Sequence, residues 1–194
     1  MKNYIKHHEW EIIEEGFDAH LNRISESIFS LGNGRMGQRA NFEENFTGDT
    51  HQGSYVAGVY YPDKTRVGWW KNGYPEYFAK VLNAPSWIGI GININGQELD
   101  LAKVKVTNFR RVLDMKRGLL HRSFTATLAD GKQVQVAAER FCSMADGEVG
   151  AIRYAITPVN FSSAARITLT VDADVVNKDS NYDEKFWNEV YQES

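Results

Sequence analysis

Apolar and polar residues alternate along most of this chain, and that pattern predicts β-strands. The clearest case is the stretch 87–95, where isoleucine occupies every second position from Ile88 to Ile94. Side chains two residues apart share one face of a strand, so these isoleucines are expected to point into a core. The same alternation predicts further strands at 104–113, 119–128, 134–138, 150–157 and 166–171, with a weaker one at 10–17. β-Branched and aromatic residues predict another strand at 54–61.

Asn-Gly and Asp-Gly pairs stand beside several of these stretches and predict hairpin turns. Type I′ turns need positive φ at both central residues, which Asn, Asp and Gly tolerate. The pairs are Asn33-Gly34, Asn95-Gly96 and Asp130-Gly131, whereas residues 18–25 and 66–83 are predicted to be loops. Short strands joined by such turns predict an all-β fold with few or no helices, built as a single antiparallel β-sandwich domain over residues 1–194.

The string at 32–37, G-N-G-R-M-G, formally matches G-x-G-x-x-G. That pattern holds phosphates in dinucleotide-binding loops when a strand precedes it and a helix follows, and kinases use a similar string over ATP. Residues 36–46 show no apolar stripe at helical spacing. A hairpin centred on Asn33-Gly34 is therefore favoured. A nucleotide-binding loop is the alternative, and it predicts a helix after Gly37.

The composition excludes several classes of protein but does not identify a ligand. The chain has 194 residues, 42% hydrophobic and 24% charged, with a net charge of −3, so it lacks the basic field that nucleic acid requires. Its one cysteine, Cys142, excludes an internal disulfide. No apolar run is long enough for a bilayer, and the first residues lack the apolar core of a signal peptide. A cytoplasmic protein with no membrane and no nucleic-acid partner is expected.

Titratable residues offer little catalytic signal. Glu43, Glu44 and Asp49 are candidates for the acid and base of glycosidic cleavage, which needs paired carboxyl groups. Adjacent residues of a strand point to opposite faces, however, and ordinary surface or loop carboxylates are the favoured interpretation. The histidines at 7, 8, 20, 51 and 121 show no metal-ligand spacing with Cys142, so no metal site is predicted.

The aromatic part of segment 66–83 is a candidate sugar contact. Aromatic rings stack on the flat apolar faces of sugars, and neighbouring polar groups add hydrogen bonds. The candidate substrate-binding residues are Trp69, Trp70, Lys71 and Tyr77. The alternative is that these rings pack against the sandwich or against a neighbouring domain.

Two longer strings resemble a known family. The first joins residues 31–34 (L-G-N-G), 39–44 (R-A-N-F-E-E) and 48–50 (G-D-T), and the second runs from Gln52 to Asn83. They resemble the amino-terminal region of glycoside hydrolase family 65, which contains maltose, trehalose and kojibiose phosphorylases. The second string is most similar to the maltose phosphorylases of that family. The later segments 152–154, 157–158 and 175–182 also fit, so the resemblance covers nearly the whole chain.

The resemblance implies a sandwich of the galactose-mutarotase-like supersandwich type, followed in the intact enzyme by a helical linker, an (α/α)6 barrel and a small carboxy-terminal sheet. The general-acid glutamate and the phosphate site lie in that barrel, so no catalytic residue is carried over to this chain. Inorganic phosphate is implied as co-substrate of an inverting reaction, with no cofactor. The implied partners are a disaccharide substrate and the protein's own catalytic barrel domain.

Two functions follow as hypotheses. The first is a non-catalytic sandwich domain of an inverting disaccharide phosphorylase, which in the intact enzyme converts maltose and phosphate to glucose 1-phosphate and glucose. The alternative is a free-standing carbohydrate-binding module that uses Trp69 and Trp70. The family's sandwich is implied to continue past Ser194, so exposed strand edges are expected to pair two copies into a homodimer.

Overall fold

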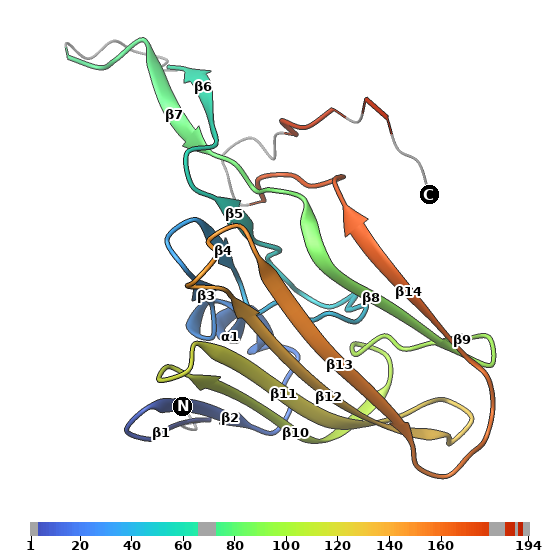
Figure 1. The fold of residues 1–194 in the computed structure, drawn as a ribbon. Helices are drawn as coiled ribbons and strands as arrows, with labels where there is room; N and C mark the ends of the chain where they lie inside the picture. The colour runs from blue at the N-terminus through green and yellow to red at the C-terminus, as the bar shows by residue number, and fades with distance from the viewer. Residues whose placement is uncertain (1–3, 66–72, 179–184, 189, 192–194) are drawn as a thin grey trace.

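The computed structural model describes residues 4–65, 73–178, 185–188 and 190–191. Its largest feature is a six-stranded antiparallel sheet in the order β1-β2-β10-β11-β12-β13 (Figure 1). The strands are β1 (Ile5–His7), β2 (Glu11–Glu15), β10 (Lys105–Asp114), β11 (Leu119–Thr127), β12 (Gln133–Cys142) and β13 (Gly150–Pro158). The alternation in the sequence predicted the last four, and the weaker strand at 10–17 is present as β2.

A second, three-stranded sheet packs on the first in the order β14-β8-β9. Its strands are β14 (Ala165–Asp172), β8 (Ser86–Ile94) and β9 (Gln97–Glu98). The isoleucines of β8 point inward as predicted, and Ile92 and Ile94 are 1% and 0% exposed. They share an apolar core with Phe109, Phe124 and Val136 of the large sheet. The chain is therefore an all-β antiparallel sandwich.

Two smaller sheets lie beside the sandwich. One consists of β3 (Leu31–Gly32), β4 (Met36–Gln38) and β5 (Ser54–Val56), and the other is the hairpin of β6 (Tyr60–Lys64) and β7 (Tyr77–Val81). A second apolar cluster, which includes Phe29, Leu120 and Cys142, connects the segment before β3 to the large sheet. The β6–β7 hairpin projects away from the sandwich (Figure 1).

The helix α1 (Asn22–Ile28) occupies residues that the sequence pattern assigns largely to a loop. It buries a polar side: Asn22, Ser25 and Glu26 are at most 2% exposed, whereas Ile24 is 54% exposed. An apolar stripe is the usual sign of an amphipathic helix, and the buried side of α1 lacks one. The loop prediction is wrong here because polar contacts, not apolar ones, hold the helix in place. No helix within the described ranges is long and apolar enough to cross a bilayer.

The first predicted hairpin is present, but its turn is shifted by one residue. The N–H of Asn33 donates to the carbonyl of Met36, so Gly34 and Arg35 are the central residues. Only Gly34 has a positive φ, 84°, which excludes a type I′ turn. The Asn33 side chain explains the shift, because its Oδ1 accepts hydrogen bonds from the N–H groups of Arg35 and Met36.

The other predicted turns also separate paired strands. Asn95 and Gly96 have φ of 54° and 85°, as a type I′ turn requires, whereas Gly131 alone has positive φ in the Asp-Gly pair. The predicted strand at 54–61 is split by a turn at Gly58, whose φ is 82°. The predicted loop at 66–83 contains β7, while residues 66–72 lie outside the described residues.

Candidate functional site

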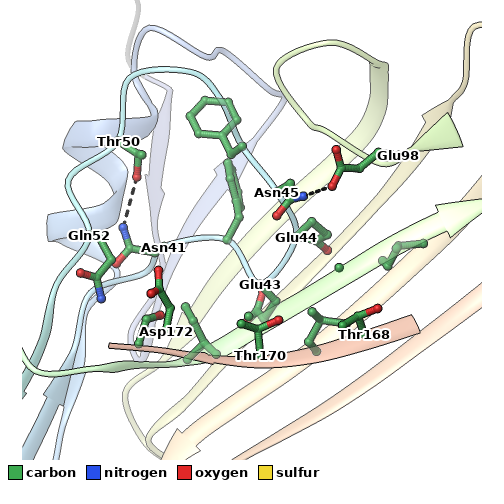
Figure 2. A pocket seen from close by; sticks show the side chains of 18 of the residues that line it. Asn41, Glu43, Glu44, Asn45, Thr50, Gln52, Glu98, Thr168, Thr170 and Asp172 are labelled. Carbon is green, nitrogen blue, oxygen red and sulfur yellow. Dashed lines mark hydrogen bonds between the residues drawn. The ribbon is translucent and has the colours of Figure 1, made fainter. Parts of the chain in front are cut away.

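A groove of about 570 Å³ lies between the loop 41–52 and the strands β8 and β14 (Figure 2). Four carboxylate side chains, Glu43, Glu44, Glu98 and Asp172, are among its lining residues. We call it the acidic groove. Loop residues and strand residues from distant parts of the chain thus meet at one surface.

Two glycines of β8 shape the acidic groove on its strand side. Gly89 and Gly91 pair with Thr170 and Thr168 of β14, and all four line the groove. A Cβ atom at Gly89 would lie 3.2 Å from the carbonyl oxygen of Thr170. Glycine therefore permits the close approach of the two strands here, and Thr168 and Thr170 join Asp172 as polar residues of β14 on this side of the groove.

Beneath the acidic groove lies a set of five residues that we call the ionic cluster: Glu43, Glu44, Arg122, Arg140 and Tyr154. Both glutamates are 4% exposed. The Nη2 atom of Arg122 donates to both carboxylates and lies 2.6 Å from Oε2 of Glu44. Nη1 of Arg140 lies 2.9 Å from Oε1 of Glu43, and the Tyr154 hydroxyl donates to Glu44. Two guanidinium groups thus balance two carboxylates in the interior.

The members of the ionic cluster hold one another in their charged forms. Burial disfavours an ionised Glu43, but the guanidinium groups of Arg140 and Arg122 outweigh burial and lower its pKa. Burial also disfavours charge on Arg122, yet Glu44 and Glu43 outweigh that cost and raise the pKa of Arg122. Burial and the Glu44 charge raise the pKa of Tyr154, so its hydroxyl stays a hydrogen-bond donor.

This arrangement suits Glu43 and Glu44 to a structural role. The general acid of a glycosidase keeps its proton near neutral pH because its pKa is raised, whereas the pKa of Glu43 is lowered. Glu43 and Glu44 lie on a loop, as the favoured interpretation allowed, but they are buried and ion-paired and are not surface carboxylates. They also share one partner, Arg122, because residues 43–44 form a bend and not a strand. The third candidate, Asp49, is exposed and lies 3.5 Å from Arg23.

Aromatic rings surround the buried guanidinium groups. Arg122 lies 5.0 Å from the ring centre of Phe42, and Arg111 lies 5.0 Å from the same ring. Arg111 also pairs with Glu14 at 3.4 Å and donates to Oδ1 of Asn22 at 2.9 Å. Burial raises the pKa of Glu14 and lowers that of Arg111 to about 10. The electron-rich ring faces supply part of the stabilisation that the buried cations lose on leaving water.

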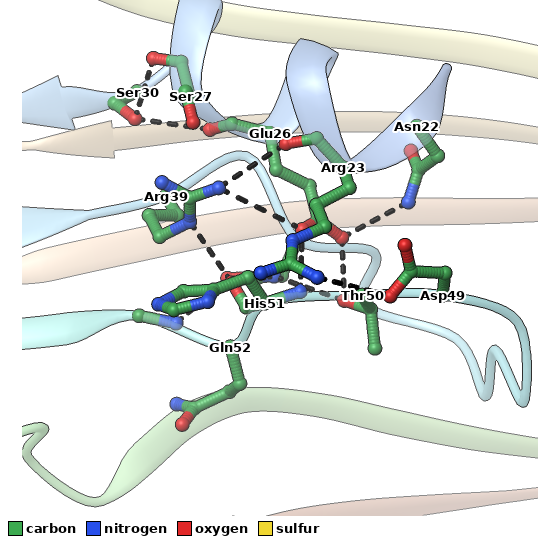
Figure 3. A network of polar contacts seen from close by, with 12 residues as sticks. Asn22, Arg23, Glu26, Ser27, Ser30, Arg39, Asp49, Thr50, His51 and Gln52 are labelled. Carbon is green, nitrogen blue, oxygen red and sulfur yellow. Dashed lines mark hydrogen bonds and ion pairs between the residues drawn. The ribbon is translucent and has the colours of Figure 1, made fainter. Parts of the chain in front are cut away.

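A second polar network anchors the other end of the loop 41–52 to α1 (Figure 3). Its centre is Glu26, which is 0% exposed. Glu26 accepts hydrogen bonds from the Asn22 amide at 2.9 Å, the Thr50 hydroxyl at 2.5 Å and the His51 N–H at 2.9 Å. Arg39 lies 3.9 Å from Glu26 and donates through Nε to the His51 carbonyl. Both ends of the loop are thus held by buried charged groups, which gives the acidic groove a fixed wall.

The predicted sugar-binding residues do not meet at the acidic groove. Trp69, Trp70 and Lys71 lie outside the described residues. Tyr77 begins β7 in the projecting hairpin, is 51% exposed, and is not among the residues that line the groove (Figure 1). Sugar binding by this segment therefore stays a prediction.

The two arginines of the ionic cluster were missed by the sequence reasoning, although a signal for them exists. Arg122 stands at the inward alternation between Leu120 and Phe124, and Arg140 continues the inward series of β12. A charged residue at an apolar position of an alternating strand predicts a buried ion pair, because an unpaired charge is costly in an interior. The pattern does not tell which acid is the partner.

The nucleotide-binding alternative is tested by the same region. The string at 32–37 forms β3, a turn and β4, so a strand stands where the nucleotide-binding alternative required a helix after Gly37. That alternative is wrong. Within the ranges that the structure describes, no group of three or more His, Cys, Asp or Glu side chains could hold a metal ion.

Fold and site together define the class of protein. It is an antiparallel β-sandwich domain with a surface groove, and buried ion pairs hold in place the loop that forms one side of this groove. Residues 12–194 match the family described as glycosyl hydrolase family 65, N-terminal domain. The chain belongs to this family, which confirms the resemblance found in its sequence.

Known relatives extend well beyond the length of this chain. It is 47% identical over 181 residues to a maltose phosphorylase of Bacillus subtilis, a match that covers 93% of this chain and 24% of the relative. It is 31% identical over 177 residues to a kojibiose phosphorylase of Thermoanaerobacter brockii, covering 91% and 21%. A solved structure of a putative kojibiose phosphorylase from the human microbiome matches with a TM-score of 0.82 and 29% identity, covering 90% and 23%. The chain thus spans about a quarter of the length of these relatives.

Proposed function

We propose that this chain is the non-catalytic amino-terminal sandwich domain of an inverting disaccharide phosphorylase of the maltose type. The observation that carries the proposal is the state of Glu43 and Glu44: the carboxylates in the acidic groove are buried and held by Arg122 and Arg140. A domain that uses its groove carboxylates as ion-pair partners is suited to scaffolding. The 47% identity to a maltose phosphorylase supports the choice of disaccharide.

In this proposal the chemistry belongs to a catalytic barrel domain of the same protein. Phosphate attacks the anomeric carbon of maltose while a barrel carboxyl protonates the glycosidic oxygen, and glucose 1-phosphate and glucose leave. Inorganic phosphate is the co-substrate, no cofactor takes part, and the reaction is placed in the cytoplasm. The sandwich contributes a rigid loop and a groove that contact the barrel.

Activity assays on separate and combined chains test this function. The 194-residue chain is incubated with phosphate and maltose, kojibiose or trehalose, and glucose 1-phosphate is measured. The chain alone should release none. Mixed with a Bacillus subtilis maltose phosphorylase that lacks its matching amino-terminal quarter, it should restore phosphorolysis of maltose, because the supplied barrel carries the chemistry and the sandwich completes it. Release by the chain alone would contradict a non-catalytic role. A mixture that stays inactive, where the Bacillus subtilis amino-terminal quarter restores activity, would contradict the assignment to the maltose type.

The alternative function, a carbohydrate-binding module, has one observation in its favour. Tyr74, Tyr77 and Phe78 place exposed rings on the projecting hairpin, with Tyr74 and Phe78 6.2 Å apart. Tryptophan fluorescence during titration with maltose, trehalose and glucose distinguishes the two functions. A scaffold should give no saturable change. Saturation that is lost in Tyr77→Ala, but kept in the control Tyr60→Ala on the neighbouring strand, would favour the module.

A further inference from the structure

The projecting β6–β7 hairpin is joined to the sandwich by two short connections. Gly58, with a φ of 82°, lies in the turn between β5 and β6, and residues 82–85 connect β7 to β8 (Figure 1). Among the described residues, no strand of another sheet pairs with β6 or β7. Hinges are short connections of this kind, where a few residues absorb a change in φ and ψ. The direction of the hairpin therefore depends on what holds these connections.

Asn83 holds the second connection through its side chain. The residue is 5% exposed. Its Oδ1 accepts the N–H of Ser54 at 2.9 Å, and its Nδ2 donates to the carbonyls of Gln52 and Val176 at 3.1 and 3.2 Å. A buried amide without partners is costly, so these hydrogen bonds favour one position of Asn83. They fix it both to the start of β5 and to the chain beyond β14.

Asn177 binds the same connection from the chain beyond β14. Its Oδ1 accepts the N–H of Asn83 at 2.8 Å, and its Nδ2 donates to the carbonyl of Val81 at 2.7 Å. One side-chain amide thus supplies the donor and the acceptor that a neighbouring strand would supply to this segment. Val175, two residues before Asn177, is 4% exposed and anchors this part of the chain in the interior.

Two aromatic residues add contacts at the same place. Nε1 of Trp187 donates to the carbonyl of Asn83 at 2.8 Å, and the ring of Phe186 lies 4.6 Å from that of Tyr61 on β6. The hydrogen bonds of Asn83, Asn177 and Trp187 all lie at the base of the hairpin. Their loss would free the direction of the hairpin and leave the pairing of β6 with β7 intact.

We propose that Asn83 and Asn177 form a latch that fixes the direction of the projecting hairpin relative to the sandwich. With the latch open, the hairpin swings as a unit about Gly58 and residues 82–85. The hairpin carries exposed aromatic rings, including that of Tyr77, so the latch also determines where these rings point. The proposal is independent of the function proposed above, because it rests only on contacts within the described residues.

Distance measurements between two spin labels test the latch in the 194-residue chain. One label is attached at Tyr77→Cys on the hairpin and the other at Arg153→Cys on β13. The parent protein also carries Cys142→Ala, which removes the native thiol. Pulsed electron spin resonance should give one narrow distance distribution for this parent. Asn177→Ala should give a broad distribution instead, because both hydrogen bonds to the base of the hairpin are lost.

Asn160→Ala is the matched control. Asn160 also binds two backbone groups, the N–H of Gln133 and the carbonyl of Gly131, but it lies beside the β11–β12 turn. Its loss should leave the distribution narrow. Trp187→Phe is a second variant of the hairpin base. It keeps an aromatic ring but lacks the indole N–H, and it should broaden the distribution less than Asn177→Ala does.

Three results would overturn the latch: a broad distribution in the parent, a narrow one in Asn177→Ala, or equal broadening in Asn160→Ala. Circular dichroism and thermal unfolding establish that each variant is folded. Hydrogen exchange separates swinging from unfolding of the hairpin. The amides of β6 and β7 should exchange at the same rate in Asn177→Ala as in the parent, because their ladder is unchanged, and faster exchange there would contradict movement as a unit.

Discussion

The interior of this protein contains charged side chains at inward-facing strand positions. Arg111, Arg122 and Arg140 are at most 5% exposed, and each has a carboxylate partner. A buried ion pair is stabilising only as a complete unit, because the desolvation of each charge is offset by its partner. Single substitutions in the ionic cluster should therefore cost far more than substitutions in surface pairs.

Removing the shared cation of the ionic cluster is the sharpest test of that idea. Arg122→Met leaves Glu44 buried without a guanidinium group, so it should lower the free energy of unfolding by about 3–5 kcal/mol. Urea denaturation measures the loss. The control is Arg153→Met, which removes an 83% exposed guanidinium that lies 3.7 Å from Glu139 and should cost less than about 1 kcal/mol. Equal losses in the two variants would show that Arg122 is not required by its buried partners.

Asp100 gives the domain a specific acid sensitivity. Burial disfavours its charge, but hydrogen bonds from Lys103, Thr47 and Ala102 outweigh burial and lower its pKa to about 2. The folded state therefore keeps Asp100 ionised where the unfolded chain would protonate it. Its contribution, about 2 kcal/mol, is complete above about pH 4 and disappears as the pH falls through about 2.

Asp100→Asn should remove that pH dependence. At neutral pH the variant should unfold with about 2 kcal/mol less free energy than the wild type, because the charge-assisted bonds are lost. Near pH 2 the two proteins should differ much less. Denaturation of both proteins over this pH range is the measurement, and a constant difference at every pH would exclude the ionised carboxylate as the cause.

At the scale of elements, turn chemistry was predictable and helix α1 was not. The β3–β4 hairpin depends on Gly34 for positive φ and on the Asn33 side chain, whose Nδ2 also donates to the carbonyls of Ser143 and Gly147. The glycine and the asparagine themselves favour this turn, so the turn can be predicted from the sequence alone. The buried side of α1 is polar, and only the partners of Glu26 explain why a helix forms there.

Gly34→Val should destabilise the hairpin through its backbone alone. A Cβ atom at Gly34 would meet no atom within 4 Å, so sterics with neighbours contribute nothing. Valine at a φ of 84° should cost about 1–2 kcal/mol. Gly37→Ala is the control, since an added Cβ there makes only an ordinary 3.9 Å contact with Leu31. Thermal unfolding of both variants provides the comparison, and a Gly34→Val protein as stable as the wild type would contradict a required turn glycine.

At the scale of the whole molecule, stability is unevenly distributed. The large sheet contributes many buried side chains to the core. The β6–β7 hairpin instead projects away from the sandwich (Figure 1), and its residues Tyr60, Tyr77 and Val81 are each at least half exposed. A two-stranded hairpin is marginal in water without a packed face. The projecting hairpin should therefore open without unfolding of the sandwich.

Hydrogen exchange measures this difference directly. The amides of β6 and β7 should exchange several orders of magnitude faster than those of β11, whose Leu120 and Phe124 lie in the core. Among the described residues, the ring of Tyr61 packs against that of Phe186 with ring centres 4.6 Å apart, and this contact opposes opening. Protection of β6 and β7 equal to that of β11 would show that the hairpin belongs to the same cooperative unit.

The sequence by itself determined the long β-strands, the Asn-Gly and Asp-Gly hairpins and the family, because strand alternation and turn chemistry depend on neighbouring residues. It did not determine which charges meet: Glu43 and Arg122 are 79 residues apart, and only the tertiary structure places the loop 41–52 against β11. Nor did alternation in β14 determine burial. Ile167, Leu169 and Val171 show the pattern of an inward face, yet they are exposed, because a local pattern records that a face requires a partner and tertiary structure decides whether one is present.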